Sequence, residues 1–203
     1  MFGLHTLLPV WIAALSAREF SFQNDRLKGA LELYKEGQLL VAAGEYIEGC
    51  DAIMTGVFSG RKIVEAMQQE DENNPESAEA LAWLVASYLT CAEARITLQQ
   101  WDKARSDAWA ACMLSRNTNP EALQCMFRVC ENTGDLFGQL SALKAMEECQ
   151  MSGLLASTRE ESARIDDAVF TGAIDDRLTM KDIKETISYV EAALLRKMNA
   201  PEE

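Results

Sequence analysis

The sequence predicts an all-α fold made of antiparallel helix hairpins, and three observations lead to it. Only four prolines and eleven glycines interrupt 203 residues that are rich in Ala, Leu, Glu, Met and Gln, so local propensity favours helix along most of the chain. Apolar residues recur at intervals of three and four, which is the spacing of one helix face. Short turns at Gly44, Gln99 and Gly134 separate consecutive helical stretches, as in helix hairpins.

The first hairpin is predicted to begin at Asn24. Gly44 interrupts its helical pattern and Glu45 restarts it, so we expect a tight turn between two antiparallel helices. The polar, acidic run 68–75 is predicted to be a solvated loop between the long second helix and the next one. The apolar face of the first helix contains Leu27, Leu31, Leu33, Tyr34, Leu39, Leu40 and Val41.

The second hairpin is predicted around the corner at Gln99–Trp101. Glu76 and Glu79 fall in the first turn of its first helix, where negative charge suits the helix dipole. The apolar residues of this helix are Leu81, Trp83, Leu84, Tyr88, Leu89 and Ile96. Those of the second helix are Ala104, Ala108, Trp109 and Met113.

The third hairpin is predicted to follow the break 117–120, with helices over 121–132 and 136–150 joined at Gly134. We expect a second break at 151–153. Ser157 and Glu160 then have the spacing of a capping box, which predicts a new helix through Ile165, Val169 and Phe170. A last helix is predicted from Thr179 or Asp182, with an apolar face made of Ile183, Ile187, Val190, Leu194 and Leu195.

The first segment, Met1–Ala17, contains no charged side chain. It has neither the basic start of a secretory signal peptide nor the arginines of a mitochondrial presequence. A short membrane-anchoring helix and a tether that docks in a protein groove remain open, and a simple cap on the helical core is a third interpretation. A membrane span needs roughly 20 apolar residues, so docking against protein is favoured. The candidate anchor residues are Leu7, Leu8, Trp11 and Ile12.

The turns at Gln99 and Gly134 are 35 residues apart, close to the period of about 34 of tetratricopeptide repeats. The gap from Gly44 to Gln99 is longer, which places an insertion at about 59–75. The stretch 35–46 resembles the opening repeat of the tetratricopeptide domains of immunophilin-type co-chaperones, which also carry an insertion before the second repeat. The resemblance covers 30–150 and rests on Gly37, Gly44, Tyr46, Trp101, Ala104, Ala111 and Gly134. It implies an α-solenoid of about three hairpins with additional C-terminal helices. The resemblance is to the interaction domain of those co-chaperones and does not include their isomerase domain.

In those co-chaperones, lysine, arginine and asparagine side chains clamp the carboxylate end of a chaperone. The matching positions here carry no cation: they are Tyr34, Gln38, Thr90, Glu121 and Cys125. Because a carboxylate clamp needs charge-assisted bonds, the resemblance implies a groove without this clamp. The predicted groove suits a basic or amphipathic segment, although ordinary exposure on a helix face accounts for the same residues equally well. Its lining residues are Tyr34, Gln38, Val41, Thr90, Glu93, Glu121 and Cys125.

The composition argues against several kinds of chemistry. A net charge of -13 repels phosphate backbones, so nucleic acid is not expected as a partner. The six cysteines form no CxxC pair and His5 is the only histidine, so neither a zinc site nor a Cys-His or Ser-His-Asp catalytic site is expected. The cysteines are predicted to be buried free thiols in a reducing compartment inside the cell. We expect no enzyme, cofactor or metal.

The sequence therefore predicts a protein-protein interaction scaffold, most simply an accessory subunit of a larger, membrane-associated assembly. Its partners would be other proteins, with a membrane contact through residues 1–17 and an organelle membrane such as the mitochondrial inner membrane as one location. The alternatives are a soluble co-chaperone or adaptor that binds client peptides, and a secreted helical protein with disulfides. We divide the chain into an anchor or docking segment (1–23), a tetratricopeptide-like domain (24–150) and C-terminal helices that pack on the solenoid (151–203).

Overall fold

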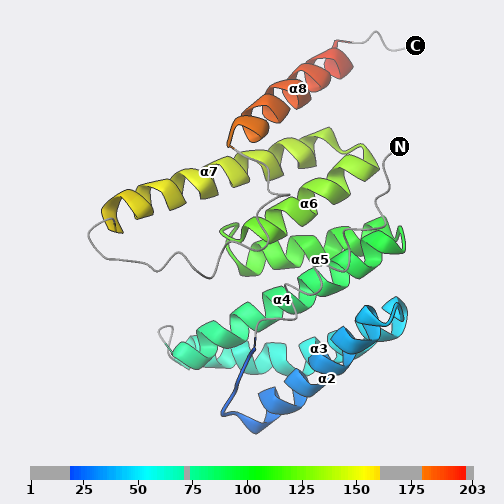
Figure 1. Ribbon diagram of the computed structural model, residues 1–203, viewed down its shortest axis with the longest axis vertical. Helices are drawn as coiled ribbons and strands as arrows, with labels where there is room; N and C mark the ends of the chain where they lie inside the picture. The colour runs from blue at the N-terminus through cyan, green and yellow to red at the C-terminus, as the bar shows by residue number, and fades with distance from the viewer. Residues whose placement is uncertain (1–18, 71–73, 161–179, 200–203) are drawn as a thin grey trace. The chain divides into compact units, whose positions relative to one another are not determined.

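A computed structural model of the chain describes residues 19–70, 74–160 and 180–199, and these ranges are all-helical (Figure 1). The predicted all-α class is confirmed for them. The described ranges contain no strand and seven helices, which are α2 (Asp25–Ala42), α3 (Tyr46–Glu70), α4 (Pro75–Thr97), α5 (Trp101–Leu114), α6 (Pro120–Thr133), α7 (Leu136–Glu160) and α8 (Met180–Met198).

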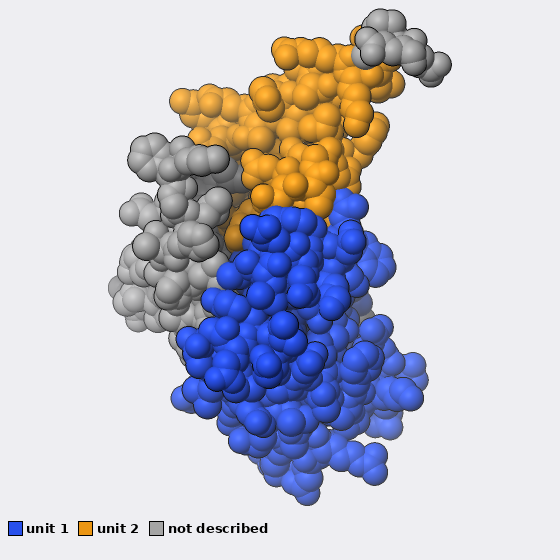
Figure 2. All heavy atoms as spheres, turned by 90° about the vertical axis from the view of Figure 1, so that its right-hand side faces the viewer, with its two compact units in different colours: residues 1–116 blue, residues 117–203 orange. Residues whose placement is uncertain are grey.

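The chain divides into two compact units, residues 1–116 and residues 117–203, which Figure 2 colours separately. Unit 1 contains α2 to α5 and unit 2 contains α6 to α8.

In unit 1, α2 and α3 form the predicted first hairpin. Gly44 lies in the turn with φ 89°, a conformation that glycine adopts without strain. The two helices approach closely where glycines face each other. A Cβ added to Gly37 would lie 2.6 Å from the carbonyl oxygen of Gly49, so only glycine fits at this crossing.

Helix α3 also packs against α4, and α4 forms the second hairpin with α5. A Cβ on Gly60 of α3 would lie 2.8 Å from the indole ring of Trp83. The absence of a side chain at Gly60 therefore allows the Trp83 ring to pack against α3. Arg95 of α4 donates a hydrogen bond to Asp107 of α5. Small side chains from α5 are completely buried: Ala104, Ala108 and Ala111.

In unit 2, α6 and α7 form the third predicted hairpin, and Gly134 ends α6 in the left-handed conformation with φ 69°. Helix α8 packs on α7, as its amphipathic pattern indicates. Lys144 Nζ lies 3.0 Å from Glu191 Oε1 across this contact. The buried residues of α8 are Ile183, Val190 and Leu194.

Two predicted boundaries are wrong. Helix α7 continues through 151–153 to Glu160, so Ser157 and Glu160 lie inside a helix and not at the start of one. A glycine in a helix interior costs about 1 kcal/mol, which is too little for Gly153 to end α7. The polar run is also shorter than expected, since α3 extends to Glu70. The helix predicted through 165–170 lies outside the described residues.

Candidate protein-binding face

Residues 19–24, called the strap below, form a non-helical stretch that leads into α2 (dark blue in Figure 1) and lies on α2 and α4. Phe20 contacts Tyr34 of α2 edge to face, with ring centroids 6.2 Å apart. Phe22 contacts Trp83 of α4 in the same way at 5.9 Å. Tyr34 and Trp83 meet at 6.5 Å, so the four rings form one buried aromatic cluster that joins the strap to both helices.

The main chain of the strap is held by two carboxylates of α4. Ser21 N donates to Glu79 Oε1 at 2.7 Å. Gln23 N and Asn24 N both donate to Glu76 Oε1, at 2.6 and 3.0 Å. Hydrogen bonds to an ionised acceptor are roughly twice as strong as neutral ones. The two carboxylates therefore stabilise the strap, whose amides are not part of a helix.

Local sequence explains why these groups meet. Asn24 caps α2, because its Oδ1 accepts from Arg26 N at 3.0 Å, and this fixes where the strap ends. Asn74 caps α4 by accepting from Glu76 N at 2.9 Å. Glu76 and Glu79 then lie one helical turn apart on one side of α4. We call the surface formed by Tyr34, Trp83, Glu76 and Glu79 the α2–α4 face.

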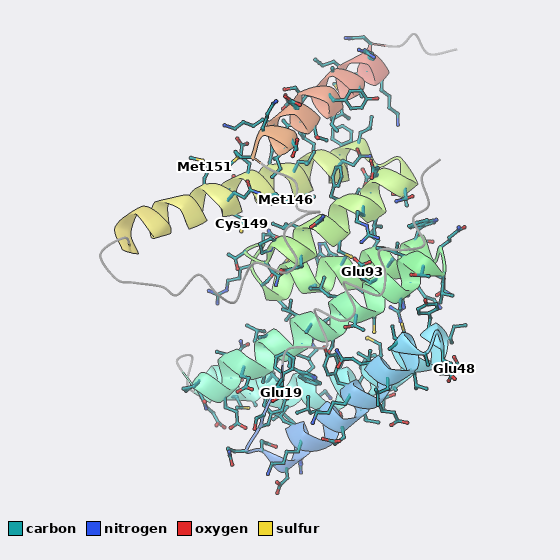
Figure 3. All side chains as sticks on the ribbon, in the orientation of Figure 1. Glu19, Glu48, Glu93, Met146, Cys149 and Met151 are labelled. Atoms are coloured by element: carbon teal, nitrogen blue, oxygen red, sulfur yellow. The ribbon has the colours of Figure 1, made fainter. Side chains whose placement is uncertain are left out.

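The predicted groove residues of unit 1 are mostly buried. Tyr34 belongs to the aromatic cluster, and Gln38 Nε2 donates to its hydroxyl oxygen at 2.8 Å. Thr90 is fully buried and donates to a main-chain carbonyl of its own helix. Glu93, labelled on α4 in Figure 3, is 7% exposed, and Val41 is 1% exposed. Within this set, the structure brings Tyr34 and Gln38 into direct contact through their side chains.

The other predicted site residues lie elsewhere. Glu121 and Cys125 are on α6 in unit 2, where Cys125 is 2% exposed. The anchor residues Leu7, Leu8, Trp11 and Ile12 fall outside the described residues.

Sequence reasoning missed the strap. The signal was present as Phe20-Ser21-Phe22, because alternate aromatic residues outside a helix place both rings on one side of an extended stretch. Glu76 and Glu79 were interpreted only as charges that suit a helix N-terminus. Their partners are more than 50 positions away in the sequence, and no local pattern connects them.

The carboxyl group of Asp107 in unit 1 has a strongly shifted pKa. Burial raises the pKa of Asp107 to about 6, although the nearby Arg95 guanidinium favours the ionised form and lowers it. This carboxyl lies in the contact between α4 and α5, away from the strap's partners. Because this pKa lies above the ordinary value, the stability of unit 1 should depend on the protonation of Asp107.

Within the described ranges, no group of three or more His, Cys, Asp or Glu residues is placed to hold a metal ion. No helix in the described part of the chain is both long and apolar enough to cross a membrane. No protein-family model matches the sequence, and a comparison with curated proteins found no match.

Proposed function

We propose that this chain is a non-catalytic protein-protein interaction scaffold, and that it serves as an accessory subunit of a larger, membrane-associated assembly. The observation that carries the proposal is the docking of the strap on the α2–α4 face. This face already holds a stretch of polypeptide through two aromatic rings and two carboxylates.

The docked strap fixes the point from which the apolar segment Met1–Ala17 starts. Glu19 follows that segment after one residue, and Ser21 is bound to Glu79. A segment without charged side chains that starts from a fixed point on the body is suited to attach the body to another protein or to a bilayer surface. A freely soluble adaptor has no use for such a segment.

We also propose that the hairpins form a tetratricopeptide-like stack. The turns at Gln99 and Gly134, which lie one repeat period apart, both contain a residue with positive φ, 56° and 69°. This equivalence supports a repeated unit of helix, turn and helix.

The second candidate function is a co-chaperone or adaptor that takes up client peptides. The chemistry of the α2–α4 face favours it: the face binds backbone amides through carboxylates and aromatic side chains through Tyr34 and Trp83. In this case, a client segment with alternating aromatic residues would displace the strap.

The test is a mild detergent extraction of the full-length chain from its native source, followed by sizing and mass analysis. The subunit function predicts a large particle of fixed stoichiometry. A variant in which Leu7, Leu8, Trp11 and Ile12 are replaced by serine should leave the particle, whereas the control F58S, at a side chain 75% exposed on α3, should remain in it. Migration of the unaltered chain alone at its own 22.5 kDa would contradict the subunit function and favour the adaptor.

A further inference from the structure

Two buried cysteines on neighbouring helices of unit 1 face each other. Cys50 lies on α3 and Cys91 on α4, and they are 4% and 0% exposed. Cys50 Sγ is 3.8 Å from the carbonyl oxygen of Cys91, and Cys91 Sγ is 3.9 Å from the carbonyl oxygen of Cys50. Because the contacts are reciprocal, the residues lie directly opposite each other across the α3–α4 contact.

Small residues hold this part of α3 in place. Gly49 precedes Cys50, and a Cβ added there would lie 2.8 Å from the carbonyl oxygen of Gly37 on α2. Ala92, next to Cys91, is completely buried. Helix α3 is thus packed closely on both sides at this level. A disulfide requires Cα atoms within about 7 Å and side chains that point toward each other. The reciprocal contacts of the two sulfurs with the opposite main chain meet the second condition.

We infer that Cys50 and Cys91 form an oxidisable thiol pair, and that a hydroperoxide converts it into a disulfide that joins α3 to α4.

The surroundings assign a role to each sulfur. The hydrogen bond from Cys91, helped by the charge of Arg95, lowers the pKa of the Cys50 thiol. The hydrogen bond to Cys50 and complete burial raise the pKa of the Cys91 thiol. The thiolate is the nucleophilic form of cysteine, so Cys50 is the residue that reacts first.

The reaction balances with hydrogen peroxide as the oxidant. The Cys50 thiolate attacks one peroxide oxygen, so that an S–O bond forms, the O–O bond breaks, and hydroxide leaves and takes up the proton that Cys50 had released. The Cys91 sulfur then attacks the Cys50 sulfenic acid and loses its own proton. The S–S bond forms, the S–O bond breaks, and a second water leaves. The two thiols lose two electrons, and the peroxide is reduced to two waters.

The bond would connect the first hairpin to the second across the chain segment that contains the acidic loop. A crosslink that closes a long loop restricts the unfolded chain and so stabilises the folded one. Oxidation should therefore fix α2 and α3 relative to α4, which together carry the α2–α4 face.

The experiment uses the full-length protein, fully reduced, freed of reductant and treated with a small molar excess of hydrogen peroxide. It is then unfolded, alkylated and analysed by peptide mass spectrometry. We expect four of the six cysteines to be alkylated, with Cys50 and Cys91 in one linked pair of peptides. The thermal midpoint should rise by several degrees and return on reduction. The control C149A should give the same linked pair, because Cys149 lies in unit 2, whereas C50A should give none.

Three results would overturn the inference. One is alkylation of all six cysteines after peroxide treatment, and another is a disulfide between any other two of them. The third is oxidation that stops at the less buried Cys149. Each is measured on the unaltered chain, so the conclusion does not depend on whether C50A folds.

Discussion

Replacing Phe22 by alanine should release the strap from the α2–α4 face. Phe22 is 3% exposed, and its ring contacts the fully buried ring of Trp83 edge to face. Removing a buried phenylalanine side chain costs about 3–5 kcal/mol. Every 1.4 kcal/mol is a factor of ten in an equilibrium, so the ratio of docked to free strap should fall by about 100- to 4,000-fold.

Chymotrypsin measures this ratio, because it cuts after Phe20 only when the strap is free. Cleavage tracks the open population when opening and closing are fast. The product that begins at Ser21 should therefore appear about 100- to 4,000-fold faster in F22A, up to the rate of a free peptide. A peptide of residues 15–28 with and without the substitution corrects for the preference of the protease.

The matched control is F58A, which removes a phenylalanine that is 75% exposed on α3 of the same unit. It should leave the cleavage rate unchanged. The reasoning is refuted if F22A yields the Ser21 product at the rate of the unaltered chain after the peptide correction, since Phe22 would then contribute nothing to docking.

Three further predictions concern unit 1. E76Q keeps the acceptor oxygen but removes its charge, so it should weaken docking by about 1 kcal/mol and speed the same cleavage several-fold, whereas E48Q, at an exposed position on α3, should not. The raised pKa of Asp107, about 6, means that its stabilising contribution is complete below its ordinary value of 3.8 and is lost as pH rises through 6. Lowering the pH from 7 to 5 should therefore raise the free energy of unfolding in urea by about 1 kcal/mol more for the unaltered chain than for D107N. An equal change in the two proteins would contradict this. G37A should lower the stability by about 1–3 kcal/mol through overpacking, while G29A, whose Cβ would meet open space, should raise it by about 0.5–1 kcal/mol; thermal unfolding that shows both changes with the same sign would rule out the close crossing as the cause.

The helices of unit 1 and the α6–α7 turn were predictable because their signals are local. Asn24 and Asn74 cap helices through their own side chains, and Gly44 and Gly134 adopt the positive φ that a tight turn needs. Each of these features depends on residues within a few positions of it.

The predicted end of α7 was wrong because the local sequence signal for a helix end at 151–153 is weak. Gly153 and the spacing of Ser157 and Glu160 resemble a helix end followed by a new start. The helix continues through them, since the cost of one glycine is small beside the hydrogen bonds of a long helix.

The α2–α4 face was not predictable from local patterns, because it depends on contacts between distant parts of the chain. Tyr34 was expected to line an open groove, yet Phe20 and Trp83 cover it. That arrangement follows from how α2, α4 and the strap pack together, which the spacing of apolar residues in α2 does not specify.

The most direct test of the account is amide hydrogen exchange of the strap in the full-length protein. If the strap is docked, the amides of Ser21 and Gln23 should exchange far more slowly than in a free peptide, and E76Q should accelerate Gln23 more than Ser21, because Glu76 accepts from Gln23 and Glu79 accepts from Ser21. Exchange of both amides at the free-peptide rate would show that the α2–α4 face does not hold the strap, and it would remove the observation on which the proposed scaffold function depends.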